Sequence, residues 1–189
     1  MYRISAALIV GLSIFAVGCS DSGPSAPSSP SSPGTSTTTF TVPLSPANEV
    51  PAITNADASG SGTATIALTV TKDGGGTITS ATANVQISVS GFPAGTAVTD
   101  AHIHNGAAGG NAGVYVNTAL AAGELAVAAG SGSVAKNGIN VPSDRAAAIL
   151  SNPAGHYFNV HTALNPGGSI RGQLAEGGAT VNSGTVDPY

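Results

Sequence analysis

Apolar and polar residues alternate along most of the chain between residues 40 and 174, and this period of two predicts strands. The clearest stretch runs from Gly60 to Thr71, where small and aliphatic residues alternate with threonines. Asp73 and Gly74 supply a hairpin turn, and an alternating strand returns from Thr77 to Ser90. The same pattern predicts further strands over residues 40–44, 98–104, 113–117, 125–127, 132–136, 156–162 and 169–174.

One segment has the period of a helix. We expect this helix over Ser143–Leu150, with Ser143 as the N-cap after Pro142, and Asn152 and Pro153 ending it. Short strands joined by turns rich in glycine and proline, with one helix, predict an all-β fold. The expected architecture is an antiparallel, Greek-key-like β-sandwich with one short helix.

The two ends of the chain differ from this domain in composition. After Arg3, the apolar run Ile4–Val17 is too short for a comfortable membrane span and predicts a signal peptide over residues 1–18. Residues 19–39 are rich in Ser, Pro and Thr and predict a disordered tether. The sandwich domain is expected over residues 40–176, and residues 177–189 show no pattern and predict a loose tail.

The end of the signal peptide resembles the lipobox of bacterial lipoproteins. Residues 16–19 read Ala-Val-Gly-Cys, and Cys19 is the only cysteine of the chain. The resemblance implies cleavage before Cys19 and attachment of acyl chains such as palmitate, which anchor the protein to a membrane. Ser20 in the next position implies the outer membrane. We therefore expect an exported, lipid-anchored protein of the cell envelope.

Charge and composition narrow the classes of partner. The formal net charge is −4, and only 7% of the residues are charged. An acidic chain without basic clusters has no electrostatic means of holding phosphates, so we expect no nucleic acid. The solvated faces must consist of Thr, Ser, Asn and Gly, which is typical of an extracytoplasmic β protein.

The predicted strand over residues 98–104 carries a His-x-His pair. Side chains alternate across a strand, so His102 and His104 share one face with Asp100. Ala101 and Ile103 then point to the opposite face, toward a core. The predicted strand over residues 156–162 carries the other two histidines. Asn159 and His161 lie together on its polar face, whereas His156 falls on the other face of that strand.

These histidines have two interpretations. In the first, His102, His104 and His161 supply three nitrogens to a single Cu or Zn ion, because imidazole suits both metals. Asp100, Asn159 and His156 are weaker candidates for the same site. In the second, the three histidines form hydrogen bonds on a polar strand face and bind no metal.

Four ordered segments together resemble the CHRD domain, a module first named in chordin: residues 48–51, 101–106, 157–162 and 170–174. The chain departs from the family pattern at Ala52, where a second proline is common, and at Ser169, where a glutamate is usual. Two of these segments contain Glu49 and Arg171, which are a candidate ion pair that closes the sandwich. The resemblance implies fold and export and implies no reaction.

Three functions are consistent with these observations. The first, which we favour from the sequence, is a non-catalytic, lipid-anchored binding or structural module of the cell envelope. It would bind a protein, a glycan or a small ligand through its histidine face and the glycine-rich rim of that face. The second is a Cu- or Zn-binding protein, and the third is an oxidoreductase with a single copper. No nucleophile motif or phosphate-binding loop is present, so no catalytic residue is predicted and we expect no enzyme activity unless copper is bound.

Overall fold

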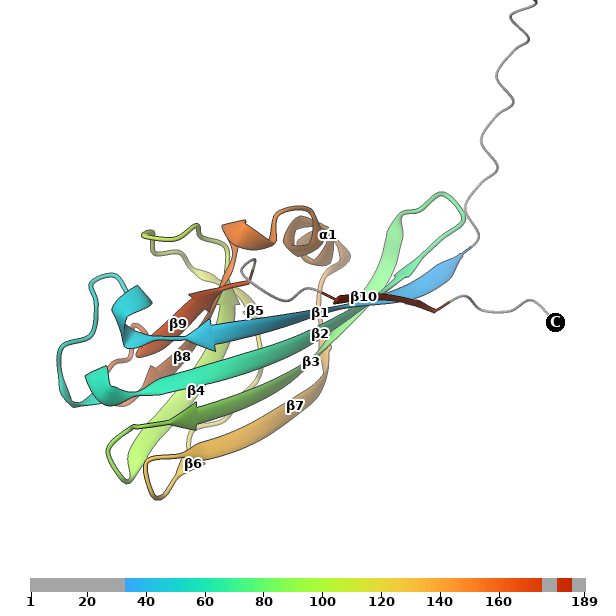
Figure 1. Cartoon of the computed structure of the whole chain (residues 1–189). Helices are drawn as coiled ribbons and strands as arrows, with labels where there is room; N and C mark the ends of the chain where they lie inside the picture. The colour runs from blue at the N-terminus through green and yellow to red at the C-terminus, as the bar shows by residue number, and fades with distance from the viewer. Residues whose placement is uncertain (1–32, 175–179, 185–189) are drawn as a thin grey trace, which may run out of the picture.

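The computed structural model describes residues 33–174 and 180–184. They form two antiparallel sheets around one hydrophobic core, with one α-helix (Figure 1), which confirms the predicted sandwich. The first sheet has the strand order β10-β1-β2-β3-β7, and the second has β5-β4-β8-β9 with β6 paired to β4. The elements are β1 (Gly34–Leu44), β2 (Ser61–Lys72), β3 (Ile78–Ser90), β4 (Thr96–His104), β5 (Val114–Asn117), β6 (Ala126–Val127), β7 (Gly132–Asn140), α1 (Ser143–Ser151), β8 (Tyr157–Thr162), β9 (Ile170–Gln173) and β10 (Thr180–Gly184), with short 3-10 turns at Pro46–Asn48, Ala56–Ser59 and Pro153–Gly155.

Strands β2 and β3 form the long hairpin that the alternation predicts. The carboxylate of Asp73 accepts hydrogen bonds from the backbone N–H groups of Gly75 and Thr77, which holds the turn. The inward side chains of β2 are almost completely buried, and the threonines between them face outward. These inward residues are Ala64, Ile66, Leu68 and Val70.

The domain begins earlier than the composition indicates. Strand β1 starts at Gly34, so the last residues of the expected tether belong to the first sheet. Thr37 pairs with Thr69 of β2, and their hydroxyl oxygens lie 2.8 Å apart. Threonine is β-branched and fits a strand, although a Ser/Thr run has the composition of a linker. Residues 1–32, which include the expected signal peptide, Cys19 and most of the tether, lie outside the described residues.

Part of the expected loose tail is also a strand. Strand β10 pairs antiparallel with β1, from Thr35 opposite Gly184 to Thr39 opposite Thr180. Ladder hydrogen bonds come from the backbone, so a segment without an apolar pattern can still join a sheet edge. The rest of the tail lies outside the described residues.

The two sheets meet at the corner where β1 ends. Ser45 forms an isolated bridge with Arg171 of β9, and each donates a backbone hydrogen bond to the other. Gly172 packs directly against the carbonyl oxygen of Pro43, where a Cβ atom would collide with backbone. A glycine is therefore required at this corner for the close approach.

Helix α1 lies over the core with Ala146 and Ile149 buried. The predicted cap at Ser143 is wrong, because Pro142 is the N-cap and no side chain caps the helix. The carbonyl of Pro142 accepts the first helical hydrogen bond from the N–H of Ala146. The helix ends before Asn152, as predicted.

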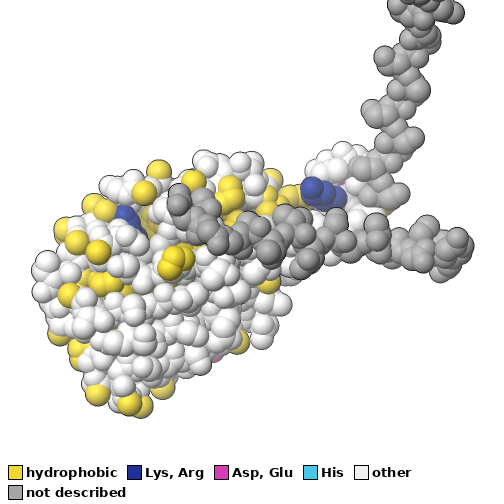
Figure 2. Space-filling model, viewed as in Figure 1, with side chains coloured by type: hydrophobic (Ala, Val, Ile, Leu, Met, Phe, Trp, Pro, Cys, Tyr) yellow, Lys and Arg dark blue, Asp and Glu magenta, His cyan; other side chains and the backbone are white. Residues whose placement is uncertain are grey.

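The surface carries few charges. Figure 2 shows a face on which Lys, Arg, Asp and Glu side chains are sparse and most of the surface is backbone or side chains that are neither charged nor hydrophobic. An exposed ion pair joins Lys136 to Glu124 at 2.8 Å. Within the described ranges, no helix combines the length and the apolar character needed to cross a membrane.

Candidate metal centre

Strands β4 and β8 bring the two histidine segments side by side. They pair antiparallel, with His102 opposite Asn159 and Asp100 opposite His161. One face of the second sheet therefore carries Asp100, His102 and His104 from β4 together with Asn159 and His161 from β8. The opposite face is core, with Ala101, Ile103, Phe158 and Val160 at most 2% exposed.

Loops cover this polar face. His102 is 8% exposed, His104 5% and His161 7%, although all three lie on the side of the sheet away from the core. The backbone carbonyl of Ala112 reaches His104 from the glycine-rich loop between β4 and β5, and the carbonyl of Pro166 reaches His161 from the β8–β9 turn. The imidazoles are therefore held inside the protein.

Each imidazole uses one nitrogen to contact an acceptor. His104 Nδ1 donates to Ala112 O at 2.9 Å, and His161 Nδ1 donates to Pro166 O at 3.0 Å. His102 Nε2 lies 3.0 Å from Oδ2 of Asp100. Carbonyl and carboxylate oxygens only accept, so these three nitrogens carry the hydrogens. The remaining nitrogens, His102 Nδ1, His104 Nε2 and His161 Nε2, keep their lone pairs.

Two of these lone pairs face each other. His102 Nδ1 lies 3.2 Å from His161 Nε2. Two neutral rings carry two hydrogens, and both are already used on Asp100 and Pro166, so none is left for the contact between the nitrogens. A cation between the rings removes the repulsion of the lone pairs. His104 Nε2 is buried and has no hydrogen-bond partner among the described residues, so it is a third unused lone pair.

The three rings already have the spacing of metal ligands. One nitrogen from each of His102, His104 and His161 lies within 4.8 Å of the others, and no other described group of this kind was found. The ring centroids form a triangle with sides of 5.0, 5.7 and 5.8 Å. At a Zn–N distance of about 2.1 Å, rings bound with tetrahedral to trigonal angles have centroids roughly 5.2–5.5 Å apart. Small side-chain movements would therefore suffice to bind an ion.

Burial keeps these histidines neutral. It is the largest cause that lowers the pKa of His102, of His104 and of His161 below the usual value of 6.5. A positive charge on one ring would also lower the pKa of the neighbouring ring. Asp100 has the opposite effect and raises the pKa of His102. Neutral imidazole is the form that binds metals.

The structure separates His156 from this group. His156 lies just before β8, donates from Nδ1 to the carbonyl of Asn152 at 3.0 Å, and packs against Tyr115 with ring centroids 5.1 Å apart. Asp100 contacts His102 as an outer hydrogen-bond partner. Asn159 lies on the histidine face, and its Oδ1 is buried without a partner among the described residues.

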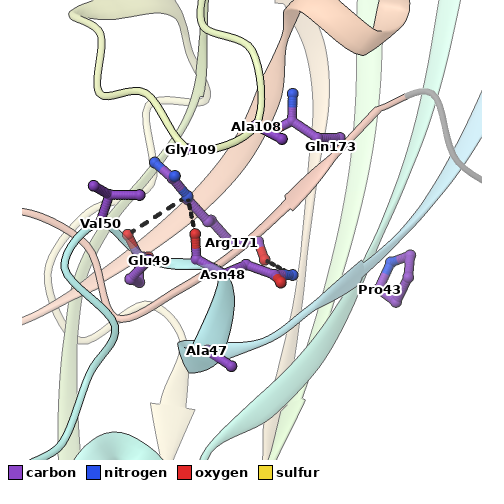
Figure 3. Close-up of a pocket in the computed structure, with 9 residues that line it drawn as sticks. All are labelled: Pro43, Ala47, Asn48, Glu49, Val50, Ala108, Gly109, Arg171 and Gln173. Carbon is purple, nitrogen blue, oxygen red and sulfur yellow. Dashed lines mark hydrogen bonds and ion pairs between the residues drawn. The ribbon is translucent and has the colours of Figure 1, made fainter.

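Glu49 and Arg171 lie beside the centre, at the wall of a cavity of about 500 Å³ (Figure 3). Nε of Arg171 is 4.0 Å from Oε2 of Glu49, and both side chains are buried. Burial raises the pKa of Glu49 to about 7, although the positive charge of Arg171 opposes this shift. The candidate ion pair is therefore long, and the carboxylate is incompletely neutralised.

Arg171 makes its shorter contacts to loops. Its Nε donates to Asn48 O at 2.5 Å, and its Nη1 donates to Gly110 O and to Asn111 Oδ1 at 3.0 and 3.1 Å. The guanidinium also lies 4.5 Å from the ring centroid of Tyr157, which stacks on His104 with centroids 4.8 Å apart. Arg171 thus ties the loop before β2 and the loop that bears Ala112 to the histidine face.

Asp57 is a residue of this region that the sequence patterns did not predict. This residue is 1% exposed, and its Oδ2 accepts hydrogen bonds from Thr162, Asn165 and Ser169. It joins the Ala56–Ser59 turn to the β8–β9 turn, which supplies the Pro166 carbonyl. Ser169 stands where the CHRD pattern usually has a glutamate, and here Asp57 supplies a buried carboxylate to it. An Asp in a turn has no distinguishing local pattern, so only the fold identifies this contact.

The fold and the site together define an antiparallel sandwich protein with three converging imidazoles on the outer face of one sheet. The profile of the CHRD domain matches residues 40–174, so the chain belongs to the CHRD domain family. This confirms the resemblance given by the four sequence segments. No curated protein and no solved structure matches the chain.

Proposed function

We propose that this CHRD domain binds one Zn or Cu ion through His102 Nδ1, His104 Nε2 and His161 Nε2. The observation that carries this proposal is the convergence of three lone pairs, each on a ring whose other nitrogen is held by Asp100, Ala112 or Pro166. Metal-binding histidines generally donate their second N–H to a carboxylate or a backbone carbonyl, which sets the tautomer and the ring orientation.

The donor set selects the class of metal. Three neutral imidazoles suit Zn²⁺ and the copper ions, whereas Ca²⁺ and Mg²⁺ prefer oxygen ligands. The chain has one cysteine, Cys19, far from these strands in sequence, so thiolate ligation from within the domain is excluded.

Burial supports an ion as the occupant of the histidine face. The three imidazoles are between 5 and 8% exposed, so a protein or a glycan has little direct access to them. A docking partner of the domain would contact the covering loops instead. Binding of an ion is therefore the function that this face supports best.

The setting that we propose is the cell envelope. The apolar N-terminal run and the lipobox-like residues 16–19 support export and a lipid anchor on Cys19, with the outer membrane as the destination. Measuring the intact mass of the membrane-derived protein and of Cys19→Ser tests this proposal. An unmodified mass for the wild-type protein would exclude the anchor.

Metal content tests the proposed centre. The purified protein is freed of metal with a chelator and dialysed against limiting Zn²⁺ or Cu²⁺. Elemental mass spectrometry then measures the number of metal ions per chain. We expect one ion per chain in the wild type and in His156→Ala, which removes a buried histidine outside the centre. We expect none in His102→Ala, His104→Ala and His161→Ala. Equal metal content in all five proteins, or none in the wild type, would exclude the site.

A further inference from the structure

Two buried oxygen atoms beside the centre lack protein partners. Oε1 of Glu49 and Oδ1 of Asn159 have no hydrogen bond among the described residues, and their side chains belong to residues 7% and 1% exposed. Leaving such an acceptor unsatisfied costs about 1–3 kcal/mol. Each oxygen therefore requires a hydrogen-bond donor.

Both oxygens lie at the same place. A Cβ atom on Gly168 would be 2.8 Å from Oδ1 of Asn159 and 2.9 Å from Oε1 of Glu49. The two acceptors are thus close enough for one small donor to bridge them, since each hydrogen bond spans about 2.8 Å. Gly168, with φ +134°, has no side chain, so the amide of Asn159 and the carboxylate of Glu49 can both lie against its backbone.

Asn159 connects this place to the histidines. It lies opposite His102 across the β4–β8 pair and two positions before His161 on the same face. Facing side chains of paired strands have Cβ atoms about 5 Å apart. The amide of Asn159 is therefore next to the position where the three lone pairs converge.

Glu49 connects the same place to solvent. It lines the cavity of Figure 3 and a second cavity of about 400 Å³, whose wall also includes Asn111, Pro166 and Gly168. Pro166 holds His161, and Asn111 precedes Ala112, which holds His104. Small molecules can thus reach Glu49 at the edge of the centre.

We propose that the ion bound by the three histidines keeps a fourth position for an exchangeable water molecule, which donates one hydrogen bond to Asn159 Oδ1 and one to Glu49 Oε1. This inference rests on the proposed function. A metal-bound water has two hydrogens to donate, which matches the two unused acceptors. Three protein ligands plus water is the arrangement of open zinc sites, whereas structural zinc sites have four protein ligands. The centre therefore accepts small exogenous ligands in place of this water.

The test uses the full-length protein loaded with Cu²⁺. Electron paramagnetic resonance in ¹⁷O-enriched water detects a coordinated, exchangeable water by line broadening, and this measurement on the wild type needs no variant. Azide is then titrated as a competing ligand. Azide cannot donate hydrogen bonds, so the two acceptors favour water over azide. We expect Glu49→Ala and Asn159→Ala, each of which removes one acceptor, to tighten azide binding about tenfold.

Glu124→Gln is the control, because it removes a carboxylate on an exposed ion pair with Lys136 and should leave azide binding unchanged. The outcomes separate the two proposals. Failure to bind either Cu²⁺ or Zn²⁺ would overturn the centre and the water site together. Bound copper without ¹⁷O broadening, or with azide affinity unchanged in both variants, would overturn the water site alone.

Discussion

His102 Nδ1 and His161 Nε2 lie 3.2 Å apart, on paired strands, with no hydrogen available between them while both rings are neutral. Asp100 and the Pro166 carbonyl hold the other nitrogens of these rings, so neither ring can turn without losing a hydrogen bond. This relationship makes the centre an arrangement that a cation stabilises.

Metal should stabilise the folded protein. A ligand that binds only the folded state at 100 times its Kd adds about 2.7 kcal/mol, which raises the Tm of a domain of this size by roughly 10 °C. We expect this shift with Zn²⁺ for the wild type and for His156→Ala, measured by calorimetry. His161→Ala should show almost no shift, and a full shift in that variant would contradict the ligand assignment.

The pH dependence of stability should change in Glu49→Gln. Burial raises the pKa of Glu49 from 4.5 to about 7, so the folded state binds more protons than the unfolded state within that window. The free energy of unfolding therefore falls as pH rises from 4.5 to 7, by on the order of 3 kcal/mol from this residue. Glutamine removes this loss, and denaturant unfolding of metal-free protein at several pH values measures it.

The histidines act in the opposite direction. Their pKa values are lowered in the folded state, so their contribution to stability is lost as pH falls below 6.5. The wild type and Glu49→Gln share this contribution of the histidines. The difference between their free energies of unfolding at each pH therefore reports Glu49 alone. A difference that stays constant between pH 4.5 and 7 would show that Glu49 is not buried as described.

Arg171→Ala should destabilise the protein and weaken the centre. It leaves Glu49 buried without its positive partner and frees the loop before Ala112, and breaking a buried pair in this way costs about 3–5 kcal/mol. Because Ala112 orients His104, metal affinity should fall about 10–100-fold. Arg171→Lys keeps the positive charge but loses the hydrogen bonds of the guanidinium to the two loops. Compared with Arg171→Ala, it should therefore restore part of the stability and little of the metal affinity. Titration calorimetry compares the three proteins.

Gly168→Ala should destabilise the fold at the contact of Gly168 with Asn159 and Glu49. The residue has φ +134°, and its Cβ atom would meet Asn159 and Glu49, so we expect a loss of about 1–3 kcal/mol. Gly167→Ala is the matched control, since no atom lies within 4 Å of its Cβ position. Unfolding of both variants in urea distinguishes them, and equal stability would contradict the close packing at Gly168.

Local patterns predicted much of the fold. The hairpin turn at Asp73 and the strands before and after it followed from composition and alternation, and so did the end of the helix at Asn152. The start of β1 and the existence of β10 did not, because edge pairing uses backbone groups that every residue has. The Ser143 cap failed because the chain enters the helix one residue earlier, at Pro142.

Alternation alone determined that His102 and His104 point away from Ile103, because neighbouring side chains of any strand face opposite sides. The tertiary structure decided which strands are neighbours, which carbonyls reach the rings, and therefore which nitrogens keep their lone pairs. It also brought Glu49 next to Asn159 across a long stretch of chain. These outcomes depend on strand pairing and loop positions between segments distant in sequence, and the pattern within a single segment contains no information about its distant partner.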